Sequence, residues 1–225
     1  MFERRINKDN NFYYMTAALI VLLLSASLVR SVVGGMVESI LEGIIGVTFF
    51  VCVVSLGVDK SWKRFMQALI AVWVVAILVK KFAVVPYLDL LMLVLMFAFF
   101  WGTFSSISKQ ILFSGSVNTN KVVGSIALFL LLGLQWALIY LLVLAFSPNA
   151  FTGVEQIAWG QNFSQMAYFS FVTLTTLGYG DISPNTPFAQ VVVYMEAIAG
   201  VFYMAIVVAS LVSAGLAQKE TEQEP

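Results

Sequence analysis

Six long apolar runs constrain this chain more than any other feature of its sequence. A helix needs about 20 mostly apolar residues to cross a hydrocarbon core about 30 Å thick. The composition agrees with such crossings, because 60% of the residues are hydrophobic and only 11% are charged. These values exclude a water-soluble globule and predict an all-α membrane protein. Helical spans are predicted over 12–33, 36–58, 62–81, 84–104, 122–146 and 187–216.

The predicted spans fall into two groups. Short breaks separate the first four spans, whereas a longer polar connector over 105–121 precedes the fifth. We therefore expect a peripheral four-helix domain over 1–121, which includes the N-terminus and the connector. A second transmembrane domain is expected over 122–217, followed by a short cytoplasmic tail over 218–225.

The distribution of Lys and Arg predicts the orientation. With the N-terminus inside, nine of the 12 basic residues lie in cytoplasmic segments, in keeping with the enrichment of positive charge there. Six spans then place both termini in the cytoplasm and the segment 147–186 outside. A cleaved leader ending near 25–27 is the alternative, but its removal would spoil this charge asymmetry.

The residue types also exclude several classes of function. The 12 basic residues are balanced by 12 acidic ones, so no basic face for nucleic acid is expected. The chain has no His and a single Cys, Cys52, which the sequence places within a span. The usual hydrolase dyads and His-based metal sites are thereby excluded. We expect no enzyme activity and no cofactor.

The segment between the fifth and sixth spans carries the chemistry. Between 162 and 181 a half-length helical pattern runs into a strip punctuated by Gly178 and Gly180. Non-helical backbone at membrane depth is tolerated only inside protein or along a water-filled cavity, as in a re-entrant pore loop. The two glycines permit backbone angles that aim successive carbonyls at one axis. Four such strips, with the Thr176 hydroxyl, can replace the hydration shell of a monovalent cation.

Residues 173–181, which read TLTTLGYGD, resemble the signature sequence of potassium channels. The chain departs from the commonest form at Leu177, where that family usually has Val or Ile. The intact Tyr179-Gly180 pair favours potassium over a mixed sodium and potassium current. The resemblance implies that Asp181 bonds the pore helix, with Tyr168 as its partner, and that Thr173 and Thr175 support the filter. It also implies K⁺ binding in a selectivity filter formed by Thr176, Leu177, Gly178, Tyr179 and Gly180, with residues from about 163 to 175 as the pore helix.

The last predicted span extends the resemblance. Residues 197–201, AIAGV, resemble the inner helix of six-segment potassium channels, with Gly200 at the gating-hinge position. A hinge and a close-packing glycine are both open readings. Helical spacing adds Met204, Val208 and Leu211 as candidates for the cavity and the inner gate.

Several polar residues within or beside the spans need partners. Glu196 is costly inside a membrane, and we expect it to face the pore helix and accept hydrogen bonds from hydroxyls such as Thr173. The alternative is a position near the outer water crevice with no special role. Glu38 and Glu42 share a helix face within reach of Arg30. Asn162 is expected to cap the pore helix, and the aromatic run over 97–101 to contact lipid.

Together these patterns predict a homotetrameric, potassium-selective channel in the lipid bilayer, because one pore motif per chain requires four chains. Asp89 is the only charged residue over 84–104, so a conventional voltage sensor is not expected. The expected location is the plasma membrane, which by analogy alone is a prokaryotic inner membrane. A non-selective cation channel, a non-conducting accessory subunit and a coupled transporter are the alternatives.

Overall fold

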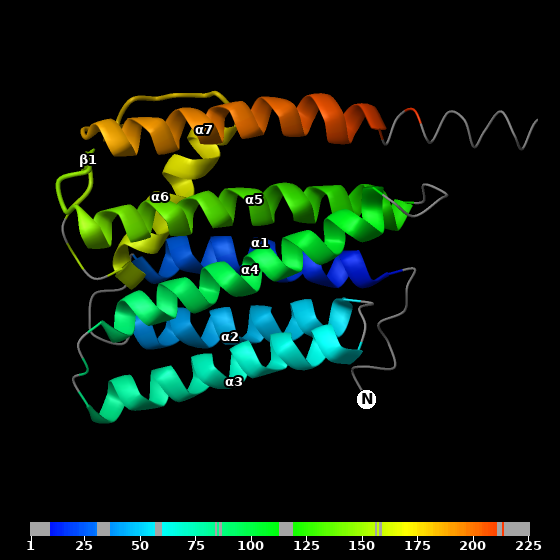
Figure 1. The fold of residues 1–225 in the computed structure, drawn as a ribbon, viewed down its shortest axis with the longest axis horizontal. Helices are drawn as coiled ribbons and strands as arrows, with labels where there is room; N and C mark the ends of the chain where they lie inside the picture. The colour runs from blue at the N-terminus through cyan, green and yellow to red at the C-terminus, as the bar shows by residue number, and fades with distance from the viewer. Residues whose placement is uncertain are drawn as a thin grey trace, which may run out of the picture.

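The computed structural model describes residues 10–30, 37–56, 60–83, 85, 87–112, 119–155, 157, 159–210 and 213. Most of these residues are helical (Figure 1). The elements are α1 (Asn11–Arg30), α2 (Val37–Ser55), α3 (Lys60–Phe82), α4 (Leu88–Leu112), α5 (Thr119–Phe146), β1 (Phe151–Thr152), α6 (Trp159–Leu174), β2 (Ser183–Pro184), α7 (Pro187–Tyr203) and the π-helix η1 (Met204–Val208).

Five helices in the described part of the chain are long and apolar enough to cross a membrane. They are α1, α3, α4, α5 and α7 with η1. The apolar part of α2, Ser39–Ser55, is shorter than the others although it packs along α1 and α3. The chain is therefore an all-α, multi-pass membrane protein, and its sixth span stays a prediction.

Several predicted boundaries are wrong. α4 continues to Leu112, so the first part of the expected connector, 105–112, is helical. Its polar residues find partners there, because the Ser106 hydroxyl donates to the carbonyl oxygen of Gly102 at 2.8 Å and accepts from the Trp62 indole at 2.7 Å. The helix α6 begins at Trp159, one turn before the start expected for the pore helix.

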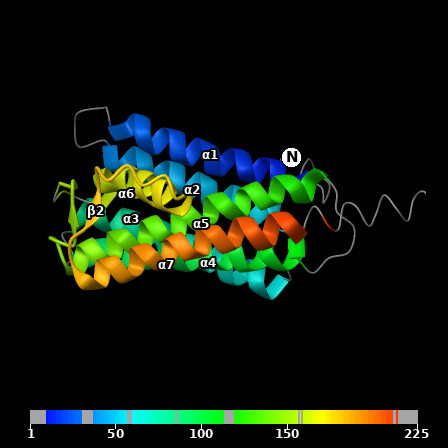
Figure 2. The ribbon, with the colours of Figure 1, turned by 90° about the horizontal axis from the view of Figure 1, so that it is seen from above.

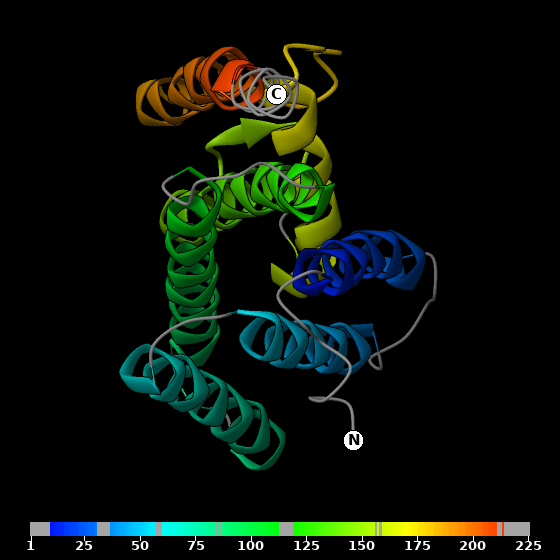
Figure 3. The ribbon, with the colours of Figure 1, turned by 90° about the vertical axis from the view of Figure 1, so that its right-hand side faces the viewer.

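The helix α5 lies at the centre of the molecule. Seen end-on, α1 and α4 pack on it from the side of the four-helix domain, and α7 lies on its opposite side (Figure 3). The shorter α6 crosses obliquely from α7 towards α1, while α7 runs alongside α5 (Figures 1 and 2). α6 thus contacts α1 and α2 as well as α5 and α7.

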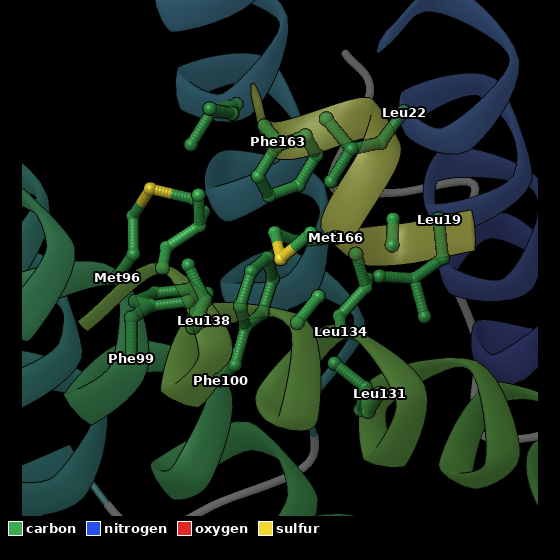
Figure 4. Packing of buried hydrophobic residues seen from close by; sticks show 14 of the residues in the cluster. Leu19, Leu22, Met96, Phe99, Phe100, Leu131, Leu134, Leu138, Phe163 and Met166 are labelled. Atoms are coloured by element: carbon green, nitrogen blue, oxygen red, sulfur yellow. The ribbon is translucent and has the colours of Figure 1, made fainter. Parts of the chain in front are cut away.

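The main core joins the two domains around α6 (Figure 4). Phe99 and Phe100 of α4 are fully buried there and pack on Phe49 of α2, whereas Trp101 is 55% exposed. Lipid contact is therefore wrong for Phe99 and Phe100. Residues that meet in this core are Leu19, Leu22, Met96, Phe99, Phe100, Leu131, Leu134, Leu138, Phe163 and Met166.

Polar contacts also fasten the first helix to α5. Asn120 lies in α5 and is buried, although the sequence had placed it in the connector. Its side-chain amide donates to Asn11 at 2.7 Å, and its oxygen accepts from the backbone N–H of Phe12 at 3.2 Å. The Asn11 amide in turn donates to the carbonyl oxygen of Ser55. These bonds satisfy polar groups that would be costly to bury alone.

Glu42 forms an ion pair with a residue that the sequence did not suggest. Glu42 is 3% exposed and lies 3.4 Å from Lys80 of α3. The side chains of Arg30 and Glu38 lie outside the described residues. Lys80 reaches Glu42 because α3 returns antiparallel to α2, which places its basic end beside the start of α2.

The outward faces of the helices are apolar. In α3 the buried residues among those described are Met66, Trp73 and Ala76, and large apolar side chains such as Val75 are exposed. A surface of this kind is suited to lipid rather than water. Cys52 lies in the core and is fully buried, as its place in a span predicts.

Candidate functional site

The strip after α6 has an alternating backbone conformation. Thr176, Gly178 and Gly180 have positive φ angles of 60°, 58° and 81°, whereas Leu177 and Tyr179 between them do not. Alternation between left-handed and ordinary conformations turns successive peptide groups to the same side. Glycine tolerates these angles readily, but Thr176 does not, and strained backbone of this kind concentrates at functional sites.

Backbone amides at the base of the strip are tied to the end of α6. The N–H of Leu177 donates to the carbonyl oxygen of Val172 at 2.9 Å, and the N–H of Gly178 donates to the same oxygen at 3.3 Å. The N–H of Thr176 donates to Thr173 at 2.9 Å. In the described part of the chain, no hydrogen bond reaches the carbonyl oxygens of 176–180. The amides therefore anchor the strip, and its carbonyl oxygens stay available.

The outer end of the strip is held by two contacts. The Tyr168 hydroxyl of α6 donates to the Asp181 carboxylate at 2.8 Å, the pairing expected from the sequence. This hydrogen bond raises the pKa of the Tyr168 hydroxyl above its ordinary value. Beside it, the antiparallel pair of β1 and β2 joins the segment before α6 to the segment after the strip.

Gly153, which follows β1, has a place at this outer end that sequence reasoning missed. Its φ is +80°, and a Cβ there would lie 2.1 Å from the carbonyl oxygen of Asp181. Only a residue without a side chain allows this approach. The surrounding loop has no periodicity that could have pointed to the contact.

Behind the strip, Glu196 of α7 is fully buried and hydrogen-bonded. The hydroxyls of Ser170 in α6 and Tyr140 in α5 both donate to its carboxyl group. The donors to Glu196 are thus Ser170 and Tyr140 and not the expected Thr173, although Ser170 lies on the same helix one turn earlier. Ser170 also lies 2.7 Å from the carbonyl oxygen of Gly133. The cluster links α5, α6 and α7 at one level behind the strip.

Tyr140 was not among the residues singled out from the sequence, although one signal was present. A hydroxyl in the middle of an apolar span needs a hydrogen-bond partner when it is buried. The Tyr140 ring also packs on Phe151 and Phe169, with centroid distances of 5.3 and 5.0 Å. It therefore contacts both the loop before α6 and α6 itself.

Gly200 is explained by close packing. A Cβ at Gly200 would lie 2.1 Å from the carbonyl oxygen of Leu174, the last residue of α6. The backbone of α7 therefore lies against the end of α6. α7 stays helical through Gly200 and changes to the π-helix at Met204, and the hinge role of Gly200 stays a prediction.

A cavity of about 680 Å³ lies at the Thr176 end of the strip. It is lined by Thr175 and Thr176 on one side and by Gly200, Met204 and Ala205 on the other. Met204 is 55% exposed, so it faces this space as its helical spacing predicts. The side chain of Val208 and the whole of Leu211 lie outside the described residues, and their expected place at a gate stays a prediction.

Asn162 does not cap α6. It lies inside the first turns of the helix, which begins at Trp159, and its side-chain amide donates to the carbonyl oxygen of Glu155 at 2.9 Å. The same amide lies 3.4 Å from the carbonyl oxygen of Ile157. The residue therefore fixes the loop before α6 against the helix.

Comparison with known protein families gives one match over the part of the chain that holds the strip. Residues 126–216 match a family model described as an ion channel. The matched region runs from α5 through α6 and the strip to the end of α7 and beyond. No curated protein and no solved structure matches the chain. The match supports an ion channel function, carried by the part of the chain that holds the strip.

Proposed function

We propose that the chain is one subunit of a homotetrameric, potassium-selective channel that conducts K⁺ passively through residues 176–180. The observation that carries this proposal is the alternation of φ at Thr176, Gly178 and Gly180. Carbonyl oxygens turned to one side and left without hydrogen bonds are the ligands that a dehydrated monovalent cation needs. K⁺ would bind between the successive oxygens of Thr176, Leu177, Gly178 and Tyr179.

The assembly follows from what a single chain leaves uncovered. Leu177 and Tyr179 are 55% and 66% exposed, although the strip carries an apolar and an aromatic side chain. The outward face of α7 also exposes large apolar residues: Phe188, Val191, Met195, Ile198, Val201 and Phe202. Four chains around one axis would bring four strips together and cover both surfaces. A ring of four strips would also complete each layer of oxygen ligands.

The support for the strip comes from the groups behind and beside it. Asp181 with Tyr168 would hold the outer mouth, and Thr173, Thr175 and the buried Glu196 cluster would hold the strip from behind. Gly200 and Met204 line the space below Thr176, where ions would enter from the cytoplasm. With both termini cytoplasmic, β1 and β2 lie at the outer end.

Gating by a conventional voltage sensor is not part of this proposal. Within the described length of α4, Asp89 and Lys109 are the charged residues, and they lie near opposite ends of the helix. Steep voltage dependence needs about 3 to 4 gating charges per subunit along such a helix. The four-helix domain over 1–121 therefore has another role.

The proposal is tested with purified protein in liposomes. We expect potassium flux down a gradient, a sodium flux at least about tenfold smaller, and loss of both in Gly178→Asp, whose carboxylate would enter the strip. The particle mass in detergent should correspond to four chains. Equal potassium and sodium flux would favour a non-selective channel, and a tetramer without flux would contradict the proposed conduction.

A further inference from the structure

The pore helix begins on a residue that the four-helix domain holds. Trp159 is the first residue of α6 and is 7% exposed. Its indole N–H donates to Asp89 of α4 at 3.2 Å, and Lys80 of α3 lies 2.8 Å from the same carboxylate oxygen. The Lys80 ammonium also lies 5.8 Å from the centroid of the Trp159 ring, within the range of a cation–π contact. We call Lys80, Asp89 and Trp159 the Trp159 cluster.

A third helix of the domain joins the same cluster. Glu42 of α2 is nearly fully buried and lies 3.4 Å from Lys80. Lys80 thus stands between two carboxylates, one from α2 and one from α4. Glu42 is withdrawn from water whereas Asp89 is half exposed, so loss of Lys80 leaves the Glu42 carboxylate poorly compensated. A change in the relative positions of α2, α3 and α4 therefore alters the contacts of Trp159.

An aromatic chain parallels these polar contacts. Trp73 of α3 is fully buried and meets Trp159 edge to face, with ring centroids 6.3 Å apart. Phe49 of α2 lies 5.6 Å from Trp73 and stacks on Phe99 of α4 at 3.9 Å. Close-packed rings of this kind transmit displacement because protein interiors have little free space. This series of aromatic rings connects the centre of the four-helix domain with the first residue of α6.

The other side of Trp159 is not packed in this way. A cavity of about 320 Å³ adjoins it, bounded by Leu90 and Leu93 of α4, Leu141 of α5 and Glu155 of the preceding loop. Trp159 therefore has neighbours from the four-helix domain on one side and room to move on the other. The position of Trp159 is therefore set by its contacts with Lys80, Asp89 and Trp73.

We propose that Trp159 is a positioning residue through which the four-helix domain controls the open probability of the filter. This inference rests on the proposed function. α6 has 16 residues, about 24 Å at 1.5 Å per residue, and its last turn supplies the Val172 carbonyl oxygen that anchors the amides of both Leu177 and Gly178. A shift of α3 or α4 moves the start of α6, and the helix carries that shift to the base of the strip.

The test uses single-channel recording of the full chain in lipid bilayers. In Asp89→Asn and Trp159→Phe we expect the open probability to change at least about fivefold, the lower end of usual coupling between sites, with the potassium to sodium permeability ratio kept. Lys80→Arg should keep the wild-type open probability, because it retains the charge beside Asp89 and Trp159, whereas Lys80→Met should change it.

Glu155→Gln is the matched control for lost charge. Its carboxylate lines the same cavity, but among the described residues it makes no bond to Trp159. A lower ion concentration at the outer mouth would reduce current in both Glu155→Gln and Asp89→Asn. A changed open probability is expected in Asp89→Asn alone. Should Trp159→Phe fail to assemble, Asp89→Asn and the Lys80 pair carry the test, since the Asp89 side chain is 54% exposed.

Amide hydrogen exchange separates this inference from the proposed function. In Asp89→Asn we expect faster exchange over the first turns of α6, about 160–166, and no change in Glu155→Gln. This readout needs no ion flux. A wild-type chain that does not conduct would therefore overturn the proposed channel function, while the contact between Asp89 and Trp159 could still be tested. The positioning role would be overturned if Asp89→Asn showed the same exchange rates in α6 as the wild type. It would also be overturned if the open probability of Asp89→Asn equalled that of the wild type.

Discussion

The backbone of Gly200 in α7 lies so close to Leu174, the last residue of α6, that a Cβ would stand 2.1 Å from the Leu174 carbonyl oxygen. The helices α7 and α6 therefore meet backbone to backbone where α6 ends, close to the start of the strip. Because the neighbouring atom belongs to the backbone, it cannot turn away as a flexible side chain would. This contact fixes the position of the strip along the axis of α7.

Gly200→Ala should therefore destabilise the protein, by about 1–3 kcal/mol or more, the usual cost of an overpacked core. The tetramer should dissociate at a lower temperature, and potassium flux should fall. Gly46→Ala in α2 is the control, since a Cβ there meets nothing within 4 Å and should gain up to about 1 kcal/mol of helix propensity. Equal thermal stability of the two variants would contradict the close contact.

Removal of the Tyr140 hydroxyl should weaken the support behind the filter. Tyr140→Phe deprives the buried Glu196 of one donor, which should cost about 1–3 kcal/mol. We expect a lower midpoint of thermal unfolding and a shorter open time. Tyr13→Phe, at a hydroxyl on the exposed face of α1, should change neither quantity. An unchanged midpoint in Tyr140→Phe would show that the carboxyl group does not depend on this donor.

The outer contact predicts an alkaline limb in the pH profile. The hydrogen bond to Asp181 raises the pKa of Tyr168, so the contribution of this bond is complete below the ordinary pKa of 10.0 and is lost as the pH rises through the higher value in the folded protein. Flux through the wild type should therefore persist at pH 10 and decline above it. Tyr168→Phe should conduct less at pH 7 and lack this contribution. Superimposable profiles between pH 7 and 11 would argue against the role of the bond.

The hydrogen bonds of Asn120 with Asn11 and Phe12, which join α5 to α1, predict that substitutions there have non-additive effects on the free energy of unfolding. Asn120→Ala leaves both the Asn11 oxygen and the Phe12 N–H without this partner and should cost about 1–3 kcal/mol. Asn11→Ala should be costly for the same reason. The double variant should lose less than the sum of the two, because neighbouring substitutions in one network couple. Additive unfolding free energies would mean that the two side chains act independently.

The filter strip was largely predictable from local sequence. The spacing of Gly178 and Gly180 predicts left-handed backbone at both residues, and both have it. The positive φ of Thr176 was not predictable, because threonine disfavours that conformation and only the surrounding contacts impose it. Gly153 was missed because its contact with Asp181 joins two loops across the outer end, and no period in the sequence records it.

Contacts between helices were harder to predict than the helices themselves. Hydropathy identifies Glu196 as a buried group in need of a partner, but its partners Ser170 and Tyr140 depend on how far one helix is displaced along another. The sequence named Thr173 instead, one turn from Ser170. Phe99 and Phe100 illustrate the same limit, since lipid and a protein core are both apolar and hydropathy does not distinguish them.

The reversal potential of single-channel current tests the central claim most directly. With potassium on one side of a planar bilayer and sodium at the same concentration on the other, each tenfold in permeability ratio moves the reversal potential by about 59 mV. The proposed carbonyl filter predicts a potential displaced by more than about 59 mV in the direction that favours potassium. A reversal potential near zero in a conducting wild-type tetramer would contradict potassium selection by residues 176–180.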